Sequence, residues 1–301
     1  MEVCKMTGLG TLMKRNTKMF FKDKGLFFTS LITPLILLVL YATFLGNVYR
    51  DSFAMAFPEG VEVPKKLLDA TVGGQLISSL LAVCCVTVAF CSNMLMVQDK
   101  VTGARKDFMI APTKNTTLAL SYYISTLLST LLICLIAVGV GFLYLGKMGW
   151  YLSGKDVACI LLDVFLLVMF GVALSSIINF FLSTQGQISA VGSMVSSMYG
   201  FLCGAYMPIS QFGEGLRNTL AFLPGTYATS LLRNHCLRGV FAELEAEGYP
   251  AQITDTLRDV IDCNIYFFDE KVGMSTMYII LGGSVAVLVG AYVIMNLVKK
   301  K

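Results

Sequence analysis

Charged residues are scarce in this sequence. Of its 301 residues, 14% are Asp, Glu, Lys or Arg and 56% are hydrophobic, whereas a soluble domain carries about 25% charged residues. Histidine and tryptophan occur once each. The composition therefore excludes an ordinary soluble fold, and the single histidine argues against catalysis by paired histidines inside the apolar part of the chain.

Two further elements are missing. No Gly-x-x-x-x-Gly-Lys-Ser/Thr sequence occurs, so this chain cannot cradle ATP phosphates in a loop of that kind. There is no evident cleavable signal peptide either. The first apolar run follows 24 mostly polar and basic residues and is too long for the core of a signal peptide, so we expect it to stay as an anchor.

Long apolar runs dominate what remains. Each is near or above the roughly 20 residues that a helix needs to cross a hydrocarbon core of about 30 Å. Because the runs are continuous rather than alternating, helices are favoured over a β-barrel. We expect an all-α polytopic membrane protein with one transmembrane domain over residues 1–301 and six spans: Gly25–Gly46, Gly73–Val97, Leu118–Leu145, Val157–Phe181, Ile188–Met207 and Gly273–Val298.

The distribution of charge predicts an orientation. Residues 1–24, residues 98–117 and the C-terminal lysines together hold 13 basic and 4 acidic residues. The other polar segments, 47–72, 146–156 and 208–272, hold 10 basic and 14 acidic residues. The positive-inside rule then places both termini and the 98–117 loop in the cytoplasm, and 208–272 outside the cell.

The nine cysteines follow no spacing pattern, so they do not predict a disulfide framework. Cys236 and Cys263 both fall in the expected extracellular segment, where a disulfide and two unpaired thiols are both compatible with the sequence. His235 next to Cys236 supplies too few ligands for zinc, so we predict no metal site.

The N-terminal arm, residues 1–24, contains an ordered apolar stripe. Leu9, Leu12, Met13 and Phe20 recur at helical spacing, with basic residues mostly on other faces. This pattern favours an amphipathic helix along the inner headgroups. The alternative is an ordinary basic flank without a helix.

The loop between the second and third runs has unexpected apolar residues. Charged Arg105, Lys106 and Asp107 are followed by Phe108, Met109 and Ile110. A plain tether needs no apolar cluster in the cytoplasm, so the pattern favours a docking surface for a protein partner. The alternative is that the cluster begins the third span or lies on the membrane.

The segment Gly204–Tyr227 is broken by prolines yet stays apolar. Pro208 should end the fifth span, and Leu216, Leu220 and Leu223 fit one helical face before Pro224. The piece is too short to span, so it predicts a re-entrant or interfacial element. A buried loop packed on the spans is the alternative. Further on, Ile253, Leu257, Val260 and Ile261 predict a small amphipathic helix that covers the spans.

Asp163 is the only acidic residue inside an expected span. An intramembrane carboxylate is a functional candidate by default. It could line a transport path, bind a cationic group, or be hydrogen-bonded at a helix interface. Asn93, Asn179 and the Ser175-Ser176 pair are more easily explained by hydrogen bonds between helices.

Taken together, the arm, the six spans, the charged loop and the broken segment resemble the permease subunit of a type-2 ABC exporter. Family members have an acidic residue, a Gly, a second acidic residue and a Pro in the loop, positions filled here by Asp99, Gly103, Asp107 and Pro112. The family's Gly, Pro and later Leu-Pro match Gly204, Pro208, Leu223 and Pro224. Asp107 replaces the commoner Glu, and Phe212-Gly213 stands where a second Leu-Pro often occurs.

The resemblance implies a transport subunit that is not itself an enzyme and holds no cofactor. A separate ABC ATPase would bind ATP and magnesium and contact Arg105, Lys106, Asp107 and Phe108. Two permease subunits, identical or different, would pair in a bacterial cell membrane, among its lipids and without nucleic acid. The cargo would be a drug, peptide, lipid or polysaccharide. An ion-gradient-driven transporter and an immunity or sensor protein on the same scaffold remain alternatives.

Overall fold

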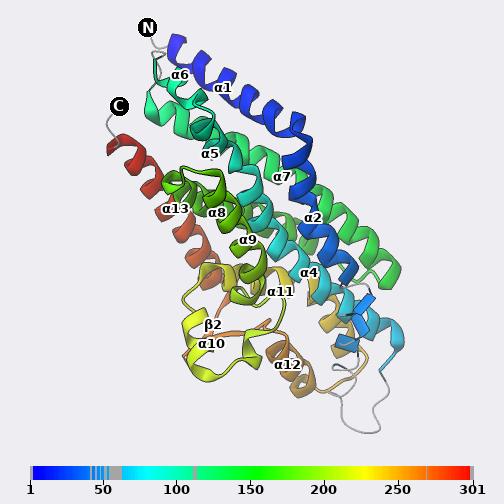
Figure 1. Cartoon of the computed structure of the whole chain (residues 1–301). Helices are drawn as coiled ribbons and strands as arrows, with labels where there is room; N and C mark the ends of the chain where they lie inside the picture. Colours follow the sequence, from blue (N-terminus) through cyan, green and yellow to red (C-terminus); the bar gives the residue numbers. More distant parts are fainter. Residues whose placement is uncertain are drawn as a thin grey trace.

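The computed structural model describes residues 3–40, 43–44, 46–47, 49–50, 53, 63–110, 114–268 and 270–298. Within these ranges the chain forms an elongated helical bundle, and its strands form one short hairpin (Figure 1). α1 begins and α13 ends at the end of the bundle that also holds α6, here named the terminal end. The opposite end, which holds α10, α12 and the hairpin, is named the hairpin end.

The elements follow one another as helices of very different length. Those of the first half are α1 (Val3–Lys22), α2 (Lys24–Leu40), α4 (Lys65–Ser92), α5 (Met94–Val101), α6 (Ala104–Ile110) and α7 (Asn115–Met148). The second half contains α8 (Gly154–Phe181), α9 (Gln185–Leu202), η2 (Ile209–Gln211), α10 (Glu214–Leu220), α11 (Pro224–Ala246), α12 (Ala251–Val260), β1 (Ile265–Phe267), β2 (Glu270–Val272) and α13 (Met274–Val298). β1 and β2 are antiparallel.

Helix α4 is the centre of the bundle. In the α4–α5 stretch, 94% of the most apolar window is buried, against 22% for α13. α2, α7, α8, α9 and α11 all pack against α4. Gly171 permits a close approach of α8 to α4, since a Cβ there would lie 3.1 Å from both the Cys85 carbonyl oxygen and Val86 Cα. A small residue at such a crossing brings two helix backbones together.

The membrane-spanning helices agree in part with the six expected spans. Four stretches are long and apolar enough to cross a membrane: α4–α5, α7, α8 and α13. α1 and α2 meet at an angle of 73° and make a fifth if they count as one broken span. α9, in place of the expected span Ile188–Met207, has 18 residues and is not among these candidates. The protein is thus all-helical and multi-pass, but the count of six is not confirmed, and the interfacial position of α1 stays a prediction.

Part of the segment 208–272 packs into the bundle, and the expected extracellular position of the segment stays a prediction. α11, which begins at Pro224, folds back and packs against α4, α8 and α13. Leu231, Leu232 and Leu237 on this helix are completely buried. The sequence obscured this because α11 also carries Arg233 and His235, whose partners come from distant parts of the chain.

The small elements of the hairpin end cover the bundle. η2 and α10 follow Pro208, and α12 packs against α11 and η2. Leu257 and Ile261 are buried while Val260 is more than one-third exposed. The amphipathic helix expected here is therefore present, with its apolar side on α11.

Gly239 marks a second close approach, between α11 and the α7–α8 connection. A Cβ at Gly239 would overlap the carbonyl oxygen of Tyr151. We expect Gly239→Ala to lower stability by about 1–3 kcal/mol, as overpacking does, and to lower the thermal midpoint of the detergent-purified protein. Gly283→Ala on α13 is the matched control, because nothing lies within 4 Å of its added Cβ. Equal midpoints for the two variants would contradict the tight contact.

Candidate functional site

Asp99 joins three helices at the terminal end. It lies on α5 and is 4% exposed. Arg15 of α1 donates to both carboxylate oxygens, with Nη2 2.9 Å from Oδ1. The Tyr122 hydroxyl of α7 donates to Oδ2 at 2.5 Å. A bidentate guanidinium–carboxylate pair fixes both distance and orientation, so α1, α5 and α7 are held in one arrangement here.

The same arginine extends this contact to α6. The Arg15 guanidinium lies over the Phe108 ring, 5.0 Å from its centroid, a distance at which a cation and an aromatic face attract. Gly103 forms the turn between α5 and α6 with a φ of +84°, a conformation that favours glycine. α6 is therefore a short helix at a sharp corner, held on its inner side by Phe108.

The outer side of α6 faces away from the bundle. Asp107 is exposed, Ile110 is 84% exposed and Arg105 is half-buried. Phe108 was expected in an exposed apolar cluster, but it is half-buried under Arg15, so Ile110 is the described apolar residue that is freely accessible. The side chain of Lys106 and all of Pro112 lie outside the described residues.

Lys100 connects the same corner to α8. Its ammonium donates to the carbonyl oxygens of Asn179, Phe180 and Leu182, at 2.6, 2.9 and 2.8 Å. The last carbonyls of a helix have no partner within the helix, and a cation there is favoured. This contact could not be predicted from the sequence, because Lys100 lies in a basic loop among other lysines and arginines that follow the positive-inside rule.

Asp163 is enclosed by polar partners. It is 1% exposed, with Oδ2 2.6 Å from His235 Nδ1 of α11 and Oδ1 accepting from the Tyr278 hydroxyl of α13 at 2.6 Å. Both oxygens have a partner, which supports the helix-interface alternative. A role in a transport path stays a prediction.

Hydrogen bonds between the α4–α5 junction and α8 take the form expected from the sequence. Asn93 Nδ2 donates to the hydroxyls of Ser175 and Ser176, each at 3.0 Å, and Asn179 Nδ2 donates to the Asn93 carbonyl at 3.1 Å. These contacts confirm the inter-helix role expected for these residues.

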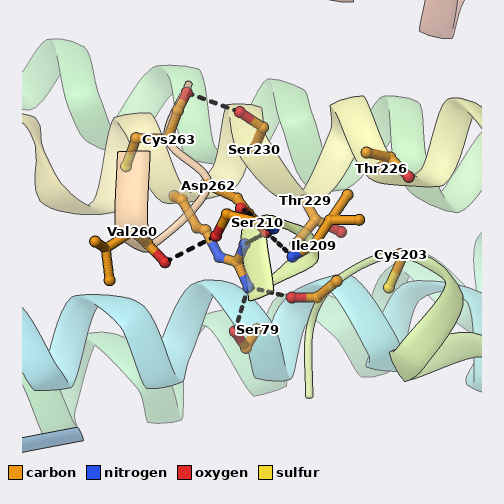
Figure 2. Close-up of polar contacts among 12 residues, drawn as sticks. Ser79, Cys203, Ile209, Ser210, Thr226, Thr229, Ser230, Val260, Asp262 and Cys263 are labelled. Carbon is orange, nitrogen blue, oxygen red and sulfur yellow. Dashed lines mark hydrogen bonds and ion pairs between the residues drawn. The ribbon is translucent and has the colours of Figure 1, made fainter. Parts of the chain in front are cut away.

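The broken segment at the hairpin end is organised by one buried arginine, Arg233. Figure 2 shows two of its partners, Ser79 and Asp262. Its side chain is fully buried and donates to the carbonyl oxygen of Gly204, which has a φ of +73° just after α9. It also pairs with Asp262 at 3.3 Å and reaches the Ser79 hydroxyl of α4 at 3.4 Å. The arginine therefore contacts α4, the end of α9 and the segment after α12.

Asp262 passes this link on to η2. Its carboxylate accepts the backbone N–H groups of Ile209 and Ser210, the latter at 3.0 Å. Burial raises the pKa of the Asp262 carboxyl above its ordinary range, while Arg233 and these N–H groups act in the opposite direction. The arrangement leaves little freedom to the segment that begins at Pro208.

The remaining candidates of this segment have local roles. Pro208 precedes η2, Leu223 precedes α11, and Pro224 is the first residue of α11, the position where proline is best tolerated. Cys236 and Cys263 are both buried free thiols, so the structure has the unpaired alternative rather than the disulfide. Among the described residues, no group of three His, Cys, Asp or Glu side chains could hold a metal ion.

The buried pair predicts a specific pattern of stability. Arg233→Met leaves Asp262 without its cation, and we expect a loss of about 3–5 kcal/mol, as for other broken buried pairs. Arg233→Met with Asp262→Asn should recover part of that loss, because no unpaired charge remains. The thermal midpoint of the purified protein measures both.

Arg258→Met is the control for this pair. Arg258 is 31% exposed and its acidic partners are 47% and 60% exposed, so its ion pairs should contribute at most about 1 kcal/mol. If the Arg233→Met and Arg258→Met proteins melted together, or if the double variant were no more stable than Arg233→Met, the structural role of Arg233 would be wrong.

Comparison with known proteins identifies the family to which this chain belongs. A comparison with curated proteins gave no match. The model of one protein family, described as ABC-2 type transporter, matches residues 7–236, from the first turns of α1 to the middle of α11. The match includes Asp99, the α5–α6 corner, Asp163 and Arg233. The chain is therefore a member of the ABC-2 type transporter family, and it is the membrane component of an ABC transporter.

Proposed function

We propose that this chain exports its cargo with energy supplied by a separate ABC ATPase that binds at α6. The observation that carries the proposal is the combination of an exposed outer side on α6 with a buried anchor directly behind it. The sequence has no phosphate-binding loop of the Gly-x-x-x-x-Gly-Lys-Ser/Thr kind, which fits hydrolysis in a partner chain.

The contacts around α6 give a route for force. A push on Asp107 and Ile110 would reach Arg15 through Phe108, and through Arg15 the Asp99 carboxylate shared with α7. A second route runs through Lys100 to the end of α8. Because these contacts are direct and at least partly buried, displacement of α6 would move α1, α7 and α8 together rather than bend a loop.

The side of the membrane follows from charge. The segments 1–24 and 98–117 and the C-terminal lysines are rich in Lys and Arg, and α1 begins and α13 ends at the end that holds α6. Both observations favour a cytoplasmic terminal end. The resemblance to type-2 ABC exporters is the ground for placing the chain in a bacterial cell membrane. The hairpin end would then face outward.

We also propose that a second permease subunit pairs with this chain. α2 and α9 expose several large apolar side chains, which either lipid or another copy would cover. Those of α2 include Phe28, Ile32, Leu35, Ile36 and Val39, and those of α9 include Met194, Met198 and Phe201. The apolar helices suit an amphipathic cargo such as a drug, peptide, lipid or polysaccharide carrier lipid.

The docking surface can be tested on its exposed residues. We expect Asp107→Arg and Ile110→Asp each to reduce co-purification of the ATPase about tenfold or more, because interface residues at the centre of a contact contribute about 2 kcal/mol. The thermal midpoint of the isolated permease should not change, since both side chains are exposed.

Lys271→Glu is the control for docking, because Lys271 is exposed at the hairpin end. It should leave ATPase binding unchanged. Normal ATPase binding by both α6 variants would remove α6 from the proposed interface.

Substitution of Asp99 distinguishes binding of the ATPase from transmission of its movement to the other helices. We expect Asp99→Asn to keep the ATPase bound, because Asp99 is buried behind α6, but to lower transport per ATP hydrolysed by about tenfold through loss of the bidentate contact with Arg15. Transport and hydrolysis measured in the same vesicles check this ratio. An unchanged ratio, or loss of ATPase binding itself, would contradict the proposed route.

A further inference from the structure

A cavity with polar side chains set in a largely apolar wall opens at the hairpin end, outside all the contacts described for α6. It has a volume of about 250 Å³ and lies between η2 and α10 on one side and the α12–β1 connection on the other. Its polar lining comes from Ser210, Arg217, Asp259, Asp262, Asn264 and Tyr266. The cavity is therefore built from segments that are far apart in the sequence and that Asp262 holds together.

The charges in this cavity are only partly used. Arg217 takes part in none of the ion pairs found among the described residues. Asp259 Oδ1 accepts from Asn264 Nδ2 at 2.7 Å and from the Tyr266 hydroxyl at 3.1 Å. No described donor lies within hydrogen-bond distance of its Oδ2. One cation and one carboxylate oxygen thus remain available to a ligand.

Asp262 contributes little further charge. Its carboxylate is paired with Arg233 and accepts two backbone N–H groups. A purely anionic ligand would meet Asp259, and a purely cationic one would meet Arg217. Because both residues line the same cavity, a ligand that carries one positive and one negative charge suits it better than a ligand of a single charge.

An aromatic rim adjoins the cavity. Ala221 and Tyr266 line it, and the next residues in the chain, Phe222 and Phe267, lie with ring centroids 5.0 Å apart. Phe268 contacts both rings. Phe222 is 63% and Phe268 52% exposed, so apolar surface continues outward from the polar lining.

The position along the bundle matches the headgroup layer of a membrane. β1 and β2 lead directly into α13, which begins at Met274 and is one of the membrane-spanning candidates. A site at the start of a span, with a few charged groups within and aromatic rings beside it, suits the layer where aromatic side chains and lipid headgroups meet.

We propose that this cavity binds a phosphoethanolamine group, with the phosphate on Arg217 and the ammonium on Asp259. Arginine is well suited to phosphate oxygens, and a primary ammonium can donate to the free carboxylate oxygen. The group comes either from phosphatidylethanolamine, whose acyl chains would follow Phe222 and Phe268, or from a free phosphate ester. The site is separate from the ATPase contact and does not depend on the identity of the cargo.

Native mass spectrometry of the full-length detergent-purified chain tests this site with three short-chain lipids: phosphatidylethanolamine, phosphatidylcholine and phosphatidylglycerol. We expect phosphatidylethanolamine to bind most tightly. Phosphatidylcholine has no N–H to donate, and phosphatidylglycerol has no cation. Equal retention of the three lipids would overturn the proposal.

Two variants assign the two charges. Arg217→Gln should weaken binding of phosphatidylethanolamine about tenfold, the effect of losing a charged hydrogen bond. Asp259→Asn should abolish the preference over phosphatidylglycerol, while its amide oxygen still accepts from Tyr266. Arg258→Gln is the matched control, since Arg258 pairs with Glu245 and Asp255 outside the cavity. Unchanged lipid binding by both cavity variants, with normal thermal midpoints, would overturn the assignment.

Competition by free phosphoethanolamine distinguishes the two sources. Displacement of the bound lipid at low millimolar concentration would assign the site to a free ester. Resistance to displacement, together with the lipid preference and the variant effects, would assign it to the membrane lipid.

Discussion

A fully buried guanidinium organises the hairpin end of this protein. Arg233 has no access to water, so its charge must be met by protein groups, and those groups come from four separate segments: Ser79, Gly204, Asp262 and, through Asp262, the start of η2. Burying a charge without such partners is prohibitively costly. The requirement fixes where the broken segment after α9 can lie, and with it the walls of the cavity beside Asp262.

At the terminal end a buried charge also has an ion-pair partner, but that partner is partly exposed. Asp99 is buried, but its partner Arg15 is only partly buried and stacks on Phe108 of an otherwise exposed helix. A charge pair at the edge of the bundle can therefore hold α6 firmly while leaving Asp107 and Ile110 free to meet another protein. Lys100 adds a second attachment, to the end of α8. The two ends differ because Arg233 at the hairpin end is completely enclosed by its partners, whereas α6 at the terminal end leaves Asp107 and Ile110 exposed.

Sequence reasoning succeeded where a local pattern was sufficient. Apolar runs predicted α4–α5, α7, α8 and α13, and the charged-then-apolar pattern of the loop marked the residues that form α6. It was incomplete where partners are distant. The sequence did not predict that α11 packs against α4 and α8, where Asp262 and Asp163 are the partners of Arg233 and His235. Phe108 was expected to be exposed because its neighbour Arg15 lies far away in the sequence, so the contact between them could not be predicted.

The sequence alone determined that this is a multi-pass helical membrane protein without a phosphate-binding loop of its own. Hydrophobic length and missing motifs are properties of the chain that hold in any arrangement of its helices. Only the tertiary structure decided that Asp163 meets His235 and Tyr278, that Lys100 caps α8, and that Arg217 and Asp259 face one cavity. Each of these depends on groups brought together from separate helices, because buried polar atoms need partners that only packing can supply.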